Sequence, residues 1–427
     1  MTSKQNLADA ITAAAGVYVR EALGTFPETG LNELALSGPA NEFAEAWAKR
    51  PAYERLAMLL TYDDAIRSLL KPSGKDAPTL YSFFAGTTLW ALQLPAALLA
   101  SALFDHMMLG IPRTVESVLS KLLDNIEALR SVALGREIEC SWVAGLIGFD
   151  IAPAQRLATA LGELRPLEPP WDRLPVWGEH RASVLMSGSL RMRVEVVTAD
   201  GRDKVSGDFG GRQEALDKVR LLRLAVMLCQ TNAKSGNSQM TVLTAGAPHL
   251  GLMGAMTESH GVVQADVPGE PLPLAEHDEV RRWCDNFARF YNSSVGVAVE
   301  RILSAATERQ QPADILIDAV MAWENLVGTE VETSFRVTAA LVCLLESDAS
   351  KRQKMLRDLQ TTYRIRSKVV HGEAVDYRDV SRHGHLALEI AKQAIRAIFE
   401  SNTWLLELRS STSRADAILL GDPRLKV

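Results

Sequence analysis

The stretch TTYRIRSKVVHGE, residues 361–373, decides how the C-terminal part of the chain is interpreted. Residues 350–371 have the apolar spacing of a helix. Four side chains of this helix share one face: Leu356, Leu359, Tyr363 and Val370. Arg366 falls in the same sector, and a guanidinium in an apolar stripe is costly unless it is paired or hydrogen-bonded. Arg366 therefore either has a buried partner or lines a site.

A carboxylate that can pair with Arg366 lies in the preceding amphipathic segment, residues 312–327. The apolar stripe of this segment consists of Ile315, Leu316, Ala319, Val320, Trp323, Leu326 and Val327. Glu324 lies at the margin of the stripe. We therefore predict a contact between Glu324 and Arg366, in which the carboxylate fixes the guanidinium rather than transferring a proton.

His371 lies at the expected end of the same helix, because Gly372 follows it and glycine is preferred just past a helix end. On a straight helix, a residue five positions after Arg366 points about 140° away from it. We therefore expect the histidine ring to be presented at the helix terminus rather than buried along its side. Arg364 is the alternative arginine, since it lies on the face of the helix that carries His371.

Arginine and histidine together suit metal-free cleavage of RNA by attack of a 2′-hydroxyl on the adjacent phosphate. Histidine can move a proton near neutral pH, and arginine can bind phosphate and stabilise the charge of the transition state. One such pair supplies only one proton-transfer group, whereas this reaction uses a base and an acid. A two-fold dimer would bring two copies of the pair together.

The run Tyr363, Arg366, Ser367, Lys368, Val369, Val370, His371 and Gly372, with Glu324 upstream, resembles the HEPN superfamily, specifically its Apea-like members. The resemblance covers residues 290–400 and implies a C-terminal antiparallel helical bundle. It also implies a dimeric, metal-independent ribonuclease with Arg366, His371 and Glu324 in catalytic roles. The neighbouring Tyr363, Arg364, Ser367 and Lys368 are then expected to bind substrate. Ser367 stands where many active HEPN nucleases have Asn, Asp or His after the motif arginine, and serine is usual at this position in the Apea-like branch.

The function that the resemblance implies is RNA cleavage in antiphage defence, in abortive infection or as a toxin. The substrate is then an RNA such as tRNA or mRNA, the assembly is a homodimer through the C-terminal bundle, and a phage-derived trigger or an antitoxin is a further partner. The alternative from another class is a non-catalytic module that dimerises or binds nucleotide or RNA. In that case the motif is buried and saturated with internal hydrogen bonds.

Hydrophobic periodicity predicts a mainly α-helical protein with four stretches. We expect a helical N-terminal region in residues 1–135, a small α/β region in 136–275, a helical bundle in 276–410 and a flexible tail in 411–427. The resemblance implies that the bundle is HEPN-like. Within the α/β region we expect strands in 182–199 and 239–246, with a turn at Asp200-Gly201, and a buried helix over 214–230. The bundle helices are expected near 277–292, 294–308, 312–327, 331–347, 350–371 and 384–408.

Composition limits the partners and the location of the protein. The net charge of −6 excludes a protein that coats nucleic acid non-specifically, so RNA contact requires a local basic patch. The four cysteines lack zinc-type spacing and favour reduced thiols. His383 and His385 could form a metal site with His371, but no cysteine or paired carboxylate supports them, and we expect neither metal nor other cofactor.

Residues 77–104 contain no charged side chain and are long enough to span a bilayer. Pro95 would break or kink a spanning helix, so two buried helices that meet near Pro95 explain the stretch as well. No signal peptide is recognised at the start of the chain. We therefore expect a cytoplasmic protein, with a membrane-tethered effector as the weaker alternative.

Overall fold

The structure is a computed structural model of the whole chain, and helices make up most of it. This confirms the expected mainly helical fold class. The chain divides into two compact units. The first comprises Met1–Gly145, Leu167–Leu216 and Thr241–Glu258, and the second Leu146–Pro166, Asp217–Met240 and Ser259–Val427. The structure describes residues 4–37, 47, 50–71, 79–80, 89–90, 93–152, 155–167, 182–193, 196–197, 204–205, 210–229, 239–245, 270–272, 274–329 and 333–427.

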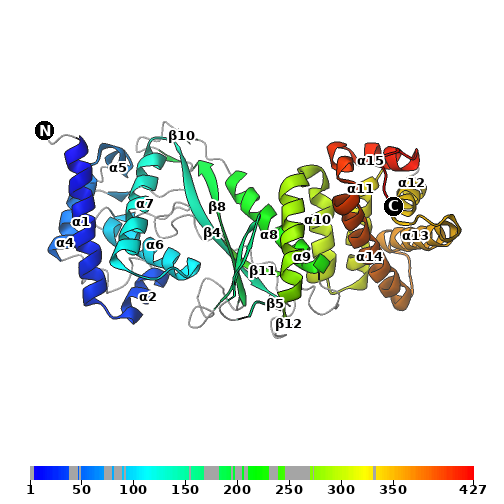
Figure 1. Ribbon diagram of the computed structural model, residues 1–427, viewed down its shortest axis with the longest axis horizontal. Coiled ribbons are helices and arrows are strands. Elements are labelled where there is room, and N and C mark those ends of the chain that lie inside the picture. The colour runs from blue at the N-terminus through cyan, green and yellow to red at the C-terminus, as the bar shows by residue number, and fades with distance from the viewer. Residues whose placement is uncertain are drawn as a thin grey trace. The chain divides into compact units, whose positions relative to one another are not determined.

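The helices of the first unit are α1 (Lys4–Thr25), α2 (Glu28–Ser37), α4 (Pro51–Tyr62), α5 (Asp64–Ser68), α6 (Leu94–Leu109) and α7 (Val115–Ala133). The helix α1 packs against α4 and α7, and α6 packs against α2 and α7 (Figure 1). Every residue of α6 from Leu94 to Met108 is buried. This explains why the C-terminal part of the uncharged stretch 77–104 is apolar on all sides. Among the residues that the structure describes, no helix has both the length and the apolar character to cross a membrane.

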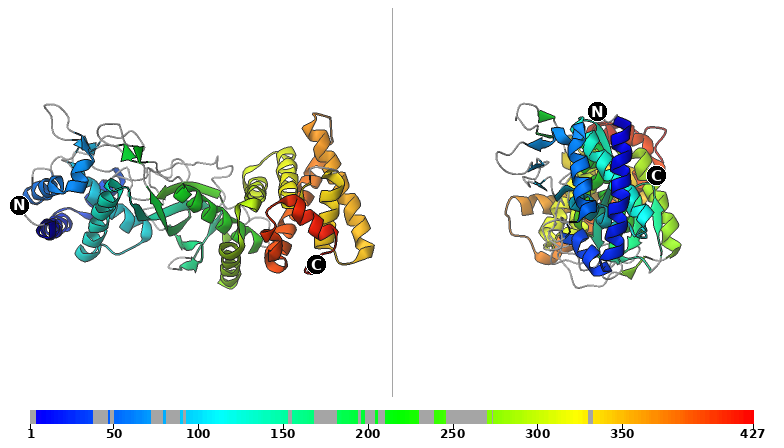
Figure 2. Two further views of the ribbon diagram at one scale, coloured as in Figure 1. Left: turned by 90° about the horizontal axis from the view of Figure 1, so that it is seen from above. Right: turned by 90° about the vertical axis from the view of Figure 1, so that its left-hand side faces the viewer.

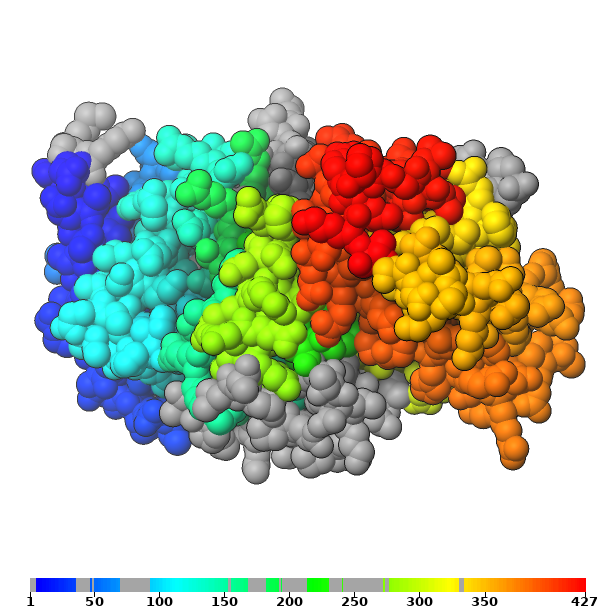
Figure 3. All heavy atoms as spheres, turned by 45° about the vertical axis from the view of Figure 1, so that its right-hand side comes forward, coloured from blue at the N-terminus to red at the C-terminus, as the bar shows by residue number. Residues whose placement is uncertain are grey.

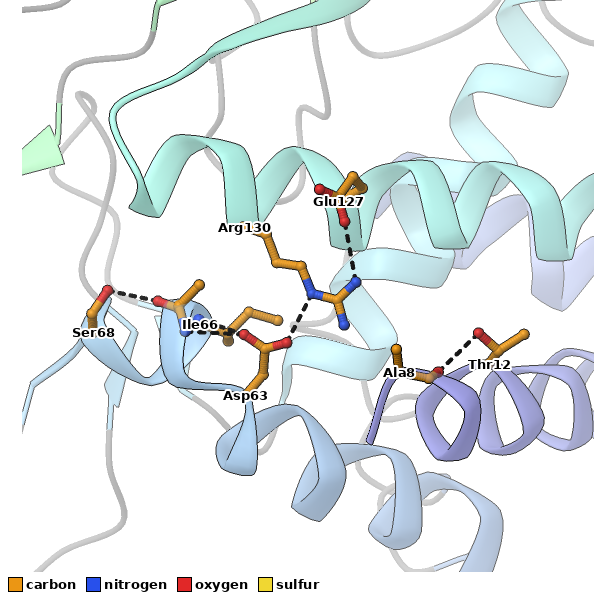
Figure 4. Close-up of polar contacts among 8 residues, drawn as sticks. Ala8, Thr12, Asp63, Ile66, Ser68, Glu127 and Arg130 are labelled. Atoms are coloured by element: carbon orange, nitrogen blue, oxygen red, sulfur yellow. Dashed lines mark hydrogen bonds and ion pairs between the residues drawn. The ribbon is translucent and has the colours of Figure 1, made fainter. Parts of the chain in front are cut away.

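A short polar network fixes the corner between α4 and α5 (Figure 4). The Asp63 carboxylate caps α5 by accepting hydrogen bonds from the backbone N–H groups of Ala65 and Ile66, at 3.0 and 3.1 Å. Its other oxygen accepts a 2.8 Å hydrogen bond from Nε of Arg130 on α7. Arg130 also contacts Glu127 one turn earlier, at 3.1 Å. One carboxylate therefore both starts a helix and ties it to a neighbouring helix.

The sheet of the first unit contains β4 (Glu137–Ile147), β8 (Val184–Arg193) and β11 (Gln239–Ala245), in the order β11-β4-β8. The strands confirm those expected over 182–199 and 239–246. Gly188 in β8 is required by packing, because a Cβ there would lie 2.7 Å from the Trp142 ring. Smaller pairings join β1 (Leu70–Lys71), β2 (Thr79–Leu80) and β3 (Leu89–Trp90), and β9 (Val196–Val197) and β10 (Lys204–Val205). The turn expected at Asp200-Gly201 lies outside the described residues.

The second unit begins with short strands. The strand β5 (Phe149–Asp150) pairs in parallel with β12 (Glu270–Pro271), and β6 (Leu157–Thr159) pairs antiparallel with β7 (Gly162–Pro166). The helix α8 (Gly210–Cys229) contributes residues 217–229 to this unit, and its residues 221–229 are all buried. The buried helix expected over 214–230 is therefore confirmed.

Helices form the rest of the second unit. They are α9 (Leu274–Phe290), η6 (Ser293–Val295), α10 (Gly296–Leu303), the π-helical η7 (Ser304–Glu308), α11 (Pro312–Val327), α12 (Thr333–Leu345), α13 (Ala349–Val370), α14 (Tyr377–Ser401), η8 (Thr403–Glu407) and α15 (Ser411–Leu419). The helices α11, α12, α13 and α14 all contact one another, and α11 and α14 lie side by side (Figure 1). The positions expected for α11, α12 and α13 are confirmed to within two residues.

Two expectations for the C-terminal part are wrong. The helix expected over 384–408 starts earlier, at Tyr377, because the Asp376 carboxylate caps it by accepting from the backbone N–H of Arg378 at 2.8 Å. Residues 411–427, expected to be a flexible tail, contain α15, which packs on α11 and α12. The tail is held because Arg414 is buried among backbone carbonyls and Asn402 bonds to the backbone of Lys426.

Candidate functional site

The helix α13 carries the motif at its C-terminal end and buries little of its length. Asp348 caps its first turn by accepting from the backbone N–H of Ser350 at 2.9 Å. Only Leu359 and Thr362 of its 22 residues are fully buried. Apolar side chains such as Leu356, Ile365 and Val369 stay half-buried, so much of the helix faces away from the core of the unit.

Glu324, Tyr363 and Arg366 lie together where α11 meets α13. The closest oxygen and nitrogen of Glu324 and Arg366 are 3.6 Å apart, which confirms the predicted contact. The Tyr363 hydroxyl donates a 2.5 Å hydrogen bond to the other oxygen of Glu324. The Arg366 guanidinium also lies over the Tyr363 ring, 5.9 Å from its centre. One carboxylate at the last turn of α11 thus positions two motif side chains.

The electrostatics of this cluster keep Tyr363 protonated and hold Arg366 beside Glu324 through charge. Burial, followed by the hydrogen bond to Glu324 and its negative charge, holds the pKa of Tyr363 well above its ordinary value. Arg366 is attracted to Glu324 through charge at 3.6 Å, which is too long for a hydrogen bond. Its Nε is buried and has no hydrogen-bond partner among the described residues. The side chains of Arg366 and Glu324 are 22% and 28% exposed, so the pair is reachable from solvent.

His371 stands at the exposed end of α13, as predicted. It caps the C-terminal end of the helix, and its backbone N–H bonds to the carbonyl of Ser367 at 3.0 Å. Gly372 then adopts a φ of 75°, and the N–H of Glu373 returns to the carbonyl of Lys368. The turn between α13 and α14, orange in Figure 2, projects from the rest of the bundle. In Figure 3 the same orange segment lies at the surface.

The other residues predicted to bind substrate lie on the same stretch with different exposures. Arg364 is exposed and bonds to the Thr361 hydroxyl at 3.2 Å. Ser367 is half-buried. Lys368 is exposed and lies 4.0 Å from Glu373, which the sequence analysis did not single out. The positive patch beside His371 is therefore partly offset by a carboxylate from the turn.

A second polar cluster, which sequence reasoning missed, lies behind the motif. His383 on α14 is 5% exposed, and its Nδ1 lies 2.7 Å from the Thr362 hydroxyl. That hydroxyl already donates to the carbonyl of Asp358, so His383 Nδ1 carries the proton and donates to it. The other ring nitrogen then accepts from Arg382 at 3.3 Å. Burial and the Arg382 charge lower the pKa of His383, which favours its neutral form.

This cluster removes His383 from the metal set considered from the sequence, because both of its ring nitrogens already face other groups. In the part of the chain that the structure describes, no group of three or more His, Cys, Asp or Glu side chains is arranged to hold a metal ion. The four cysteines are free thiols.

Comparison with known proteins found no relative of this chain. No family model, curated protein or solved structure matches the chain. The arrangement at the end of α13 must therefore be interpreted from its own residues.

Proposed function

We propose that the protein is a metal-independent RNA endonuclease of HEPN type, acting in antiphage defence, abortive infection or as a toxin. The observation that supports this most directly is the arrangement on α13. A guanidinium that Glu324 holds through charge at 3.6 Å, and whose side chain is 22% exposed, lies on the same helix as an exposed terminal histidine. A purely structural ion pair would more often be saturated by hydrogen bonds.

In the proposed reaction, His371 takes the proton of a ribose 2′-hydroxyl, and the 2′-oxygen forms a bond to the adjacent phosphorus. The bond from phosphorus to the 5′-oxygen breaks, and a protonated histidine supplies the proton to that leaving oxygen. The products are a 2′,3′-cyclic phosphate and a 5′-hydroxyl end. Arg366 binds the phosphate and stabilises its transition-state charge, while Glu324 and Tyr363 hold the guanidinium in place.

Two copies of the chain make this chemistry complete. His371 caps α13 one residue after its end and keeps the helical bond to Ser367, so five residues of helical rotation turn it about 140° from Arg366. One histidine also cannot serve as both base and acid within one step. We therefore propose a homodimer in which the ends of two α13 helices face each other across one RNA strand.

The alternative is a non-catalytic HEPN-like module that dimerises or binds nucleotide or RNA. It is favoured by one observation, namely that Lys368 lies near Glu373 and the local positive charge at His371 is reduced. This alternative predicts that the formation of new RNA ends does not depend on His371, whereas the nuclease requires that it does.

The experiment compares cells that express the wild type, His371→Ala and Arg366→Ala. His385→Ala serves as the matched control, because this histidine lies on α14 outside the motif and is exposed. Growth is scored with and without phage, and RNA is sequenced for new 2′,3′-cyclic phosphate ends. Dimerisation of each variant is measured by sedimentation.

The nuclease is supported if wild type and His385→Ala produce growth arrest or phage resistance and new RNA ends, which both motif variants lose while still dimerising. If the motif variants equal wild type in phenotype and RNA ends, the nuclease is wrong and the motif is structural.

A further inference from the structure

We propose that a cavity in the second unit, away from the Arg366 and His371 motif, binds a nucleotide through its phosphate group. The cavity has a volume of 760 Å³ and lies between the end of α9, at residues 289–293, and η8 with the residues that follow it, 403–409. It shares no residue with the motif. Sites for small ligands commonly enclose about 300–1,000 Å³, so one nucleotide fits this space.

Hydrogen bonds between its two walls make the cavity a fixed feature. Asn292 caps η6 by accepting from the backbone N–H of Ser294, and its amide donates a 2.9 Å bond to the carbonyl of Leu406 in η8. The buried Arg414 donates to the carbonyl of Leu408 at 2.8 Å and to the Ser294 hydroxyl at 3.2 Å. The two walls are therefore joined by two sets of hydrogen bonds, and little reorganisation is needed when a ligand enters.

Two unpaired cations line this cavity. Arg289 and Arg409 are exposed and form no ion pair within the described part of the chain. By contrast, Arg301 and Arg309 of the same unit both bind Asp318. The Arg289 guanidinium lies over the Phe290 ring, 5.0 Å from its centre. A stacked guanidinium keeps the N–H donors at its edge available for an anion.

The remaining wall groups identify the class of anion as a nucleotide rather than a simple phosphate. Two guanidinium groups match the bidentate binding of a phosphate. The Glu407 carboxylate would repel a second anion but accepts hydrogen bonds from ribose hydroxyl or base amino groups. Phe290 supplies apolar surface for the sugar or base. The bound nucleotide is either a free mononucleotide or one unit of an RNA strand, and the test below distinguishes the two.

The test measures binding to the full chain carrying His371→Ala, so that an RNA probe is not consumed. The probes are AMP and a short, 5′-labelled oligouridylate. The cavity variant adds Arg289→Ala and Arg409→Ala. The matched control adds Arg67→Ala and Arg281→Ala, which remove the same charge from exposed surface pairs elsewhere. Thermal unfolding of each variant verifies that it is folded.

The proposal requires saturable binding that the cavity variant weakens about ten-fold or more and the control leaves unchanged, because charge-assisted hydrogen bonds are lost. Arginine-dependent binding of AMP alone identifies a free nucleotide, and arginine-dependent binding of the oligouridylate identifies a strand unit. Equal binding by all three proteins, or binding of neither probe, overturns the proposal. RNA-end formation is read separately in cells, so failure of the ribonuclease proposal is a distinct result.

Discussion

At the scale of single residues, Glu324 has a position that explains why an arginine is tolerated in the stripe of α13. Its two oxygens serve different motif groups, with Oε1 accepting from Tyr363 and Oε2 facing Arg366. The pair is partly exposed, so its contribution to stability is small, on the order of 1 kcal/mol or less. We expect the pair to matter more for the orientation of the Arg366 guanidinium than for stability.

Glu324→Gln is therefore expected to separate positioning from stability. The glutamine keeps the size of the side chain and an oxygen for Tyr363 but removes the charge that attracts Arg366. We expect formation of new RNA ends to fall about ten- to a hundred-fold, because small misplacements of a catalytic group carry that cost. The free energy of unfolding in urea should change by less than about 1 kcal/mol. Unchanged RNA ends would contradict a positioning role.

We expect the buried His383 to make the free energy of unfolding depend on pH. Its folded-state pKa is lowered by burial and Arg382, with Asp379 and Asp358 opposing the shift. The unfolded chain therefore binds a proton more readily than the folded one, and stability is lost as pH falls below the ordinary histidine pKa of about 6.5. Urea unfolding at neutral and mildly acidic pH should show a smaller acid loss in His383→Gln than in wild type. Equal losses would rule out His383 as a cause.

At the scale of secondary-structure elements, helix limits were predicted best where the apolar periodicity ends beside a residue that starts or stops a helix. The limits of α11 and α13 follow from Pro312 at the start of one and Gly372 after the other. The start of α14 was missed because residues 377–385, which follow Asp376, are mostly polar and contain one aliphatic side chain, Val380. The tail was wrongly expected to be flexible because Arg414 holds it in place. From composition alone, a charged side chain is expected to face solvent, whereas Arg414 is buried.

Arg414 fastens α15 to the end of the helix that carries Glu324. Its guanidinium donates to the carbonyls of Leu326 and Asn325 at the end of α11, at 2.7 and 2.8 Å. Burial lowers the pKa of Arg414 to about 10, still far above neutrality, so it is charged under ordinary conditions.

Arg414→Met should consequently destabilise the second unit. The methionine fills part of the volume but leaves several buried carbonyls without a donor, and we expect a loss of about 3–5 kcal/mol. Arg424→Met is the matched control, because this exposed arginine pairs with Asp422 and lies over the Trp404 ring. The control should cost less than about 1 kcal/mol. Chemical denaturation measures both, and equal losses would show that the α15 contact is not specific.

At the scale of the whole molecule, contacts between distant segments limit what the sequence could predict. Glu324 and Arg366 were paired correctly because Arg366 falls within an apolar stripe and Glu324 lies at the margin of another. The Thr362 and His383 contact was not foreseen, because a neutral buried histidine leaves no irregularity in either stripe. The cavity between residues 289–293 and 403–409 joins two stretches with no shared period or motif. Such sites depend on packing that residue spacing does not encode.

The last prediction concerns dimerisation through the exposed end of α13. Val370 and Tyr377, on either side of the α13–α14 turn, are 49% and 67% exposed. A stable interface buries about 1,200–2,000 Å² in total, so a second copy must also cover the half-buried apolar residues along α13. We therefore expect the wild type to sediment as a dimer at micromolar concentration.

Val370→Glu should then produce a folded monomer, because two carboxylates would be buried opposite each other at a two-fold interface. Phe335→Glu is the control, since Phe335 is 54% exposed on α12, outside the motif helix. Sedimentation should show a dimer for the control and a monomer for Val370→Glu, with thermal unfolding similar in both. The monomer should form no new RNA ends, because one copy presents one histidine. A Val370→Glu monomer that still cleaves RNA would place the complete site within a single chain and require a second proton-transfer group there.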